Sequence, residues 1–548
     1  MRRVFVVGMV ALAACAPKPA ADLVILGKTW TGDASAPLAQ GVAIQGDSIV
    51  AVGDSAAVSR WIGPKTEPVR AAGLVTPGFM DDHVHLMEGG AQLASVDLRD
   101  AATPAEFTRR IKTFAATLKP GEWIIGGDWD HELWPGTPLP DRSWIDSVTP
   151  NNPVFVNRLD GHMSLANSAA LAAAKVDRSI KPIAGGEIVR RPNGDLTGLL
   201  KDEATGVVAA AMPAPSEGRN DADLARAMAH AASLGVTGIS SVSTTWSGGI
   251  AALRRARAAG TLTFRVSNYI PLGDWRSMAD SVKANGPGDD WIRVAGVKGL
   301  VDGSLGSTTA YFDAPFTDKP ATSGFLTTPE DSLRRWITAA DSAGLQVVVH
   351  AIGDRANGLL LDIFEASAKQ NGPRDRRFRI EHAQHLRPRD IPRFAALGVI
   401  ASMQPYHAAD DGRWAEKRIG PERIKTTYAF RSLLDAKARL VFGSDWFVAP
   451  LNPMLGIKAA VTRETIDGKQ PNGFVPEQKI SVEEALRAYT VDNAYGMFWD
   501  AKIGQLKPGM KADIAVLDRD LLSIPADSLD RAKVRLTVVG GKVVFRAP

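Results

Sequence analysis

Short apolar runs alternate with helix-like stretches through the middle of this 548-residue chain. The runs are rich in valine, isoleucine and leucine, which is typical of buried strands, while the stretches between them have helical periodicity. Strands that alternate with helices favour an α/β fold in which a parallel sheet closes into a (β/α)8 TIM barrel. The eight predicted strands are 74–80, 236–242, 264–270, 294–301, 345–350, 378–381, 399–403 and 440–443.

The two ends of the chain have a different pattern. Their apolar runs are shorter and are separated by turn-forming glycines, which indicates antiparallel strands. We expect 22–73 and 502–548 to form one small composite β-sandwich domain, and 74–501 to form the barrel. The interval 98–219 is too long for a single strand–helix unit, so we interpret it as an insertion after the first barrel strand that shapes the pocket.

The first 21 residues are interpreted as an export signal and a tether. Arg2 and Arg3 precede an apolar stretch that is too short to span a bilayer, and Leu-Ala-Ala-Cys15 follows. This layout resembles a bacterial lipoprotein signal; the alternative is an ordinary signal peptide with a chance cysteine. Ala16 then favours the outer membrane. We therefore expect an exported protein of the bacterial cell envelope that meets the membrane only through a lipid anchor at Cys15.

Composition excludes several classes of protein. Cys15 is the only cysteine, so no disulfide can form within the chain. The formal net charge is only +4, and no basic run has aromatic residues interleaved with it, so we predict no nucleic-acid partner. The composition does not decide between a monomer and a homo-oligomer, and the partner expected from the motifs below is a small-molecule, amide-type substrate.

The strongest local signal is a pair of histidines, His83 and His85, at the end of the first predicted strand. Side chains two residues apart in a strand project from the same face, so the two imidazoles can bind one cation. Neutral imidazole suits zinc and similar metals. An H-x-H pair alone is a weak signal, but the carboxyl ends of barrel strands are where active sites lie.

Three more polar residues end predicted strands. His350 ends the fifth, His382 follows the sixth, and Asp445 follows the eighth. Because a barrel brings the carboxyl ends of its strands to one mouth, we expect these side chains to converge on the histidine pair.

Six segments resemble the amidohydrolase superfamily and, within it, the YtcJ-like (amidohydrolase-3) group. The resemblance implies a barrel with a split β-domain. It also implies a divalent metal site, with zinc favoured and one or two ions, held by His83, His85, His350, His382 and Asp445. The segments are 77–85 (PGFMDDHVH), 297–307 (VKGLVDGSLGS), 350–357 (HAIGDRAN), 380–384 (IEHAQ), 443–445 (GSD) and 504–513 (GQLKPGMKAD).

Lys298 is a further candidate ligand. In many members of the superfamily a lysine of the fourth strand is carboxylated and bridges two metals, and the resemblance implies this for Lys298. A desolvated, cation-rich pocket favours the neutral amine that carboxylation requires, because it lowers the lysine pKa. The alternative is a lysine that pairs with Asp302, in which case a one-metal site remains.

The expected reaction is hydrolysis of an amide-type C–N bond by metal-activated water. The resemblance gives Asp445 the role of the catalytic group that moves the proton from water to the leaving nitrogen. His162, in the insertion, is a second catalytic candidate that binds substrate or its carbonyl oxygen; the alternative is a packed or capping histidine. Hydrolysis of an ester, lactone or cyclic amide on the same scaffold remains open, as does a lipid-anchored ligand-binding protein.

Overall fold

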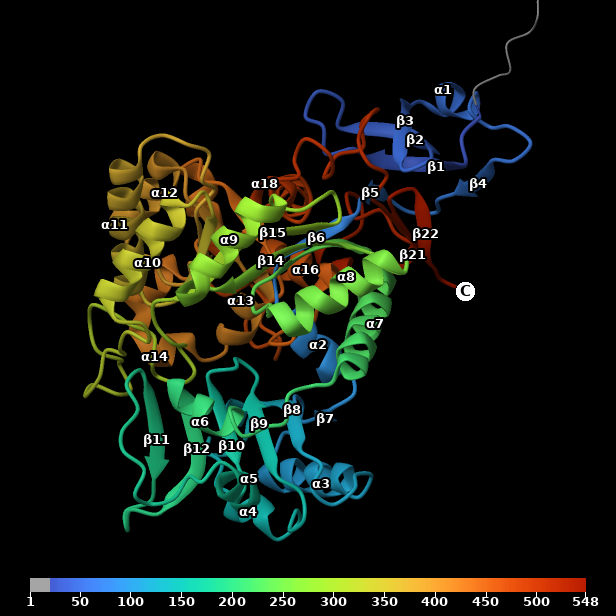
Figure 1. Cartoon of the computed structure of the whole chain (residues 1–548). Helices are drawn as coiled ribbons and strands as arrows, with labels where there is room; N and C mark the ends of the chain where they lie inside the picture. The colour runs from blue at the N-terminus through green and yellow to red at the C-terminus, as the bar shows by residue number, and fades with distance from the viewer. Residues whose placement is uncertain (1–19) are drawn as a thin grey trace, which may run out of the picture.

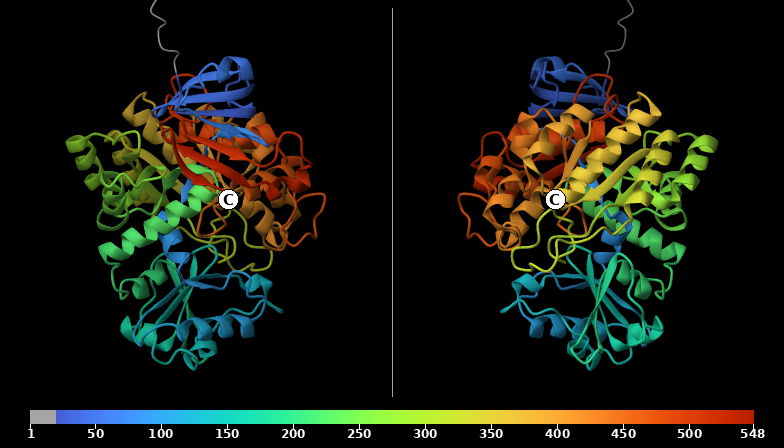
Figure 2. Two further views of the ribbon diagram at one scale, coloured as in Figure 1. Left: turned by 90° about the vertical axis from the view of Figure 1, so that its right-hand side faces the viewer. Right: turned by 90° about the vertical axis from the view of Figure 1, so that its left-hand side faces the viewer.

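The computed structural model describes residues 20–548, so the predicted signal peptide and Cys15 lie outside the described residues. Within this range no helix is both long and apolar enough to cross a membrane. The chain forms three parts arranged along one direction: a sheet made from both ends, a barrel in the middle, and a separate lobe at the far end (Figures 1 and 2).

The middle part is the predicted eight-stranded parallel barrel. The strands follow the order β19-β18-β17-β16-β15-β14-β13-β6. The two end strands of this order meet where the backbone N–H of Asp445 donates to the carbonyl oxygen of His83 at 2.8 Å. Most strand residues are buried, because helices cover the outside of a parallel barrel. The strands are β6 (Phe79–Val84), β13 (Val236–Ser241), β14 (Arg265–Pro271), β15 (Ile292–Leu300), β16 (Gln346–Ala351), β17 (Arg379–His382), β18 (Ile400–Met403) and β19 (Leu440–Phe442).

The helices around the barrel have the apolar spacing that the sequence predicts. In α7, for example, Ser216 caps the first turn by accepting the backbone N–H of Arg219, and Leu224, Ala227 and Ala231 are buried on one face. The helices are α2 (Leu86–Gln92), α7 (Glu217–Ser233), α8 (Ala251–Ala258), α9 (Trp275–Asn285), α10 (Glu330–Ser342), α11 (Asp354–Asn371), α12 (Ile391–Leu397), α13 (Pro405–Asp411), α14 (Ala415–Arg423), α15 (Phe430–Asp435), α16 (Pro453–Thr462), α17 (Val482–Ala488) and α18 (Val491–Gly496).

Strands from both ends of the chain join in one eight-stranded sheet. The junction is the antiparallel pair β5–β20, in which Thr76 lies opposite Ala515. Ile25 and Ile44 from the first part share a hydrophobic core with Ile514 from the last part. The elements are β1 (Leu23–Trp30), β2 (Leu38–Gln45), β3 (Ser48–Gly53), α1 (Ser55–Ser59), β4 (Glu67–Arg70), β5 (Val75–Pro77), β20 (Ile514–Leu517), β21 (Val534–Val539) and β22 (Lys542–Arg546).

The first predicted barrel strand, 74–80, is wrong in its bounds. The segment divides at Gly78: β5 belongs to the terminal sheet, and the barrel strand β6 begins at Phe79. Gly78 packs directly on the next barrel strand, where an added Cβ would lie 2.2 Å from Thr237 Oγ1. As a result, His83 lies inside β6, whereas His85 lies just past it, at the N-cap of α2.

The predicted insertion is a lobe with a sheet of its own. Its six strands follow the order β11-β12-β10-β9-β8-β7. Phe107, Trp129 and Trp134 form the centre of a core that is separate from the barrel core. The lobe lies beside the barrel end that carries α2 and α14 (Figure 1). Its elements are β7 (Val96–Asp97), α3 (Pro104–Ala115), β8 (Ile124–Trp129), α4 (Ser143–Asp146), β9 (Val154–Arg158), β10 (Met163–Ala166), α5 (Ser168–Ala173), β11 (Gly186–Arg190), β12 (Leu196–Asp202) and α6 (Gly206–Ala209).

Candidate metal centre

A cavity of about 520 Å³ lies between the carboxyl ends of the barrel strands and the lobe. The barrel supplies its floor, which includes all of the predicted metal-site residues. The lobe supplies its roof, which includes Asp160, His162 and Asp202. The insertion therefore lines the pocket, as the sequence predicts.

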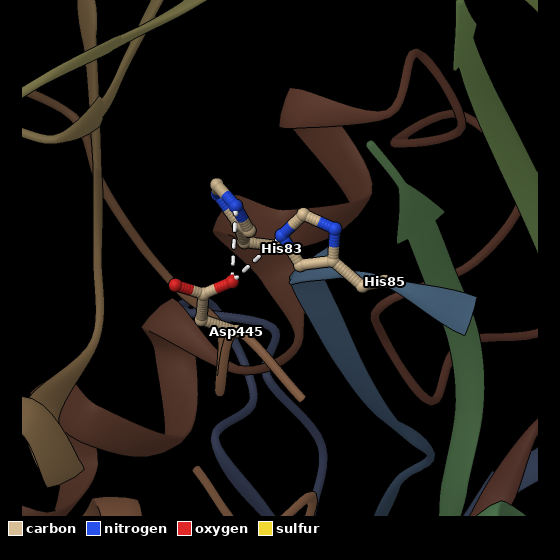
Figure 3. A group of neighbouring side chains, drawn as sticks. All are labelled: His83, His85 and Asp445. Atoms are coloured by element: carbon tan, nitrogen blue, oxygen red, sulfur yellow. Dashed lines mark ion pairs between the residues drawn. The ribbon is translucent and has the colours of Figure 1, made fainter. Parts of the chain in front are cut away.

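Three predicted ligands form the centre of the floor (Figure 3). Asp445 Oδ1 lies 3.3 Å from His83 Nε2 and 3.1 Å from His85 Nε2. The backbone of Asp445 adopts φ +61°, a left-handed conformation that aspartate tolerates better than most residues. His382, at φ +73°, is the second predicted ligand in this conformation, and its Nδ1 lies 4.0 Å from Asp445 Oδ2.

Hydrogen bonds behind the histidines fix which ring nitrogen faces the cavity. His83 Nδ1 lies 2.5 Å from Glu381 Oε2, and His382 Nδ1 lies 2.8 Å from Gln404 Oε1. Because both partners accept, each Nδ1 is assigned the proton, which leaves a lone pair on Nε2. His350 is turned the other way, since its Nε2 donates to the carbonyl oxygen of Gly303 at 3.1 Å. An imidazole that binds a metal usually donates its other ring N–H to such a partner, which fixes the orientation of the ring.

Burial keeps these imidazoles neutral. It lowers the pKa of His83 to about 4 and holds the pKa values of His350 and His382 well below the usual range. Burial acts in the opposite sense on Asp445, but the adjacent His83 and His85 outweigh it and hold the carboxyl pKa well below its usual value. The floor thus combines neutral nitrogen ligands with an ionised carboxylate.

This donor set fits a divalent metal. Asp445 Oδ1 is buried and accepts no hydrogen bond within residues 20–548, although imidazole nitrogens face it. A buried carboxylate oxygen beside the lone pair of His83 is unfavourable unless a cation compensates both groups. Imidazole nitrogens with one carboxylate are ligands that zinc accepts. His83, His85 and Asp445 lie close enough together to hold one ion.

His407 is a member of the site that we did not predict. It lies in α13, just after β18, and it forms a second possible metal-binding group with His382 and Asp445. Its ring is parallel to that of His382, with 6.3 Å between the centroids, and its Nε2 is buried without a partner in the described chain. The sequence signal was its place four residues after the seventh predicted strand.

Lys298 lies in β15, and its Nζ is 3.4 Å from His83 Nε2. Burial lowers its pKa, which increases the neutral fraction that carboxylation needs. Asp302, the alternative partner, accepts backbone N–H groups from Ile352 and Gly353 instead. Among the described residues no ion pair joins Asp302 to Lys298, so the lysine remains available to the metal centre.

His162 faces the metal cluster from the roof of the cavity. It lies between β9 and β10, and its ring centroid is 5.2 Å from that of His350. Its Nδ1 lies 2.6 Å from Asp202 Oδ1. Burial alone would lower the pKa of His162, but the carboxylates of Asp202 and Asp160 raise it by more. The pKa of His162 therefore lies at about 9. The imidazole is therefore protonated at neutral pH, unlike those of His83, His350 and His382.

We expect single alanine substitutions at His83, His85, His350 and His382 each to lower the metal content of the purified protein. Each change removes one ligand nitrogen from a site with few alternatives. Elemental analysis of protein prepared with added zinc measures the effect. His230→Ala is the matched control, because His230 lies in α7 and does not line the cavity. Full metal occupancy in all four variants would disprove the site.

The fold and the site together define a barrel hydrolase of the metal-dependent class. The chain belongs to the amidohydrolase family, whose model matches residues 72–545. This confirms the superfamily that the sequence motifs indicated.

Proteins of similar sequence match this chain over most of its length. LONG AFTER FAR-RED 3 of Arabidopsis thaliana is 39% identical over 96% of this chain and 92% of its own length. Putative amidohydrolase YtcJ of Bacillus subtilis is 30% identical over 88% and 91%. N-substituted formamide deformylase of Arthrobacter pascens is 28% identical over 95% and 97%. Among solved structures, an uncharacterized metal-dependent hydrolase from Pyrococcus horikoshii superimposes with a TM-score of 0.74, at 28% identity over 92% of this chain and 99% of that one.

Proposed function

We propose that this protein hydrolyses an amide-type C–N bond, such as that of an N-acyl compound or a formamide. The observation that carries the proposal is the unpartnered carboxylate oxygen of Asp445, held between His83 and His85 under a roof that bears a cationic imidazole. The similarity to an N-substituted formamide deformylase supports the choice of bond.

The metal, when bound, supplies a Lewis acid that activates water and polarises a carbonyl group. Asp445 takes a proton from the attacking water while the water oxygen bonds to the carbonyl carbon. It then gives this proton to the nitrogen as the C–N bond breaks, so that an amine and a carboxylic acid leave. The ionised state of Asp445 suits the first of these two steps.

His162 is proposed to stabilise the carbonyl oxygen as negative charge develops on it. Its Nδ1 is engaged by Asp202, so Nε2 is the nitrogen that is free to donate into the cavity. We expect His162→Asn to lower kcat about 100-fold or more, because donors aimed at an oxyanion contribute effects of this size. Steady-state kinetics measures the loss, and metal content should stay unchanged. If kcat is unaffected, His162 has only a packing role.

We propose zinc as the metal, which His83, His85, His350, His382 and Asp445 would hold, with a carboxylated Lys298 as a further ligand that would allow a second ion. Lys298→Ala is then expected to reduce the metal-to-protein ratio from about two to about one, because a ligand of the second ion is lost. A carbamate carbon signal after loading with ¹³C-bicarbonate should appear in the natural protein and be absent from the variant. A ratio of one in both proteins would instead favour the single-metal site.

The bond that is cleaved can be tested with a substrate panel. The metal-loaded protein is assayed with N-alkylformamides, N-acyl amino acids, cyclic amides, lactones and esters. Turnover of the open-chain amides at the highest kcat/KM supports the proposal. Preference for an ester, lactone or cyclic amide would replace it, since metal ligands alone do not select the leaving group. Tight ligand binding without turnover of any compound would favour a binding protein.

A further inference from the structure

A second cavity, of about 730 Å³, adjoins the metal-site cavity. It lies among α2, the lobe, the segment 214–220 and the segment 243–249. Glu88, Ser243 and Phe447 line both cavities, so the two spaces are neighbours across these three side chains. Neither the metal centre nor the proposed reaction steps use this space.

The junction between the cavities lies beside a predicted metal ligand. Phe447 meets His85 edge to face, with 5.7 Å between the ring centroids. On the other side Ser243 Oγ donates to Glu88 Oε2 at 3.1 Å. A group that extends from the metal cluster past His85 would have to pass Phe447 to enter the second cavity.

The residues that line the second cavity favour neutral groups over anionic ones. Met87, Ala91, Ile125 and Pro215 give it apolar surface in addition to Phe447. Its charged lining residues are all acidic, and since Asp223 is already paired with Arg219 and Arg226, Glu88 and Glu217 are the groups that repel an anion. No lysine, arginine or histidine lines it within the described chain. Such a space favours a neutral apolar group and disfavours an anionic one.

We propose that the second cavity binds a neutral, mainly apolar substituent of the substrate, such as an alkyl or aryl group attached to the amide. The inference rests on the proposed function, because it takes the scissile bond to lie at the metal cluster. Each methylene that moves from water into the cavity should raise affinity roughly fourfold. Substrates with a short substituent should then have a much lower kcat/KM than long ones.

Alkyl hydroxamates test the cavity without any need for turnover, because the hydroxamate group binds metal directly. Calorimetry on the metal-loaded protein compares acetohydroxamate with octanohydroxamate. We expect octanohydroxamate to bind at least about 100-fold more tightly, because four buried methylenes at about fourfold each give about 250-fold. The monohydroxamate of suberic acid has the same carbon count with a terminal carboxylate, and it should bind at least about tenfold more weakly than octanohydroxamate. Equal affinities across the three compounds would overturn the proposal.

Two variants locate the alkyl chain. Ala91→Phe fills the cavity from α2, and it should reduce the affinity ratio of octanohydroxamate to acetohydroxamate below ten. Ala94→Phe is the matched control, because Ala94 is exposed and does not line the cavity; it should keep the ratio of the natural protein. Ala214→Phe introduces the same bulk from an exposed loop that also lines the cavity, which avoids any disturbance of α2. An unchanged ratio in both lining variants would place the chain elsewhere and overturn the proposal.

The outcomes for the cavity and for the reaction are separable. Chain-length dependence in the hydroxamates without hydrolysis of any amide would uphold the cavity and disprove the proposed reaction. Hydrolysis of amides with no chain-length dependence in the hydroxamates would uphold the proposed reaction and disprove the role of the cavity.

Discussion

Asp445→Asn is expected to lower kcat by about 10³-fold or more while much of the metal stays bound. The amide oxygen of asparagine can still face the cation, but it cannot take a proton from water at neutral pH. General acid–base groups contribute about 10²- to 10⁴-fold, and Asp445 is proposed to act in both proton transfers. The change is measured by kcat under saturating substrate together with elemental analysis of the same sample.

Asp435→Asn provides the matched control for this substitution. Asp435 is exposed at the end of α15, where it pairs with Arg431, and it should leave both kcat and metal content unchanged. Unchanged turnover in Asp445→Asn would refute the catalytic role. Loss of metal in parallel with activity would make Asp445 a ligand only.

Arg379→Met is expected to lower the free energy of unfolding by about 3–5 kcal/mol. Arg379 is fully buried in β17, where its guanidinium donates to Asp82 Oδ1 at 2.6 Å and to Glu381 Oε1 at 2.7 Å. Its removal takes the guanidinium away from two carboxylates in the barrel interior, which keep their hydrogen bonds to Ser240 and His83. Burial already raises the pKa of Asp82 to about 7 while the arginine is present. Urea denaturation followed by circular dichroism measures the loss.

A surface arginine gives the comparison. Arg431 pairs with Asp435 and Glu484 at the edge of α15, and Arg431→Met should cost at most about 1 kcal/mol because water screens these pairs. Equal effects of the two substitutions would contradict a structural role for the buried network. The Arg379 variant should also bind metal more weakly, since Glu381 orients His83.

The convergence of the site was predictable because it depends on topology. Histidines and an aspartate at the ends of parallel strands must meet at one mouth, and His83, His350, His382 and Asp445 do so. The site residues on helices and in the lobe were harder to predict. His407 lies in the first turn of α13, and its place after the seventh predicted strand is a weak signal until the direction of that helix is known, which brings its ring beside His382.

The pattern of hydrophobic residues did not reveal two features of the barrel: the break within its first apolar run and the buried charges of β17. The apolar run 74–80 reads as one strand, although Pro77 and Gly78 within it are typical of a break between strands. The segment that begins at Arg379 alternates charged residues with an apolar one, which does not fit a buried strand unless the charges pair inside the barrel. Arg379 pairs with Glu381 of the same strand and with Asp82 of β6, a contact between residues almost 300 positions apart.

The pairing of β5 with β20 has a consequence for synthesis of the protein on the ribosome. β5 emerges more than 400 residues before β20, so during most of translation its edge lacks the strand that finally covers it. Unpaired strand edges are templates for aggregation. Nascent chains that stall before residue 514 should therefore be the species that most need a chaperone. A stop codon placed just before residue 514 should yield insoluble protein, even though every barrel strand is present.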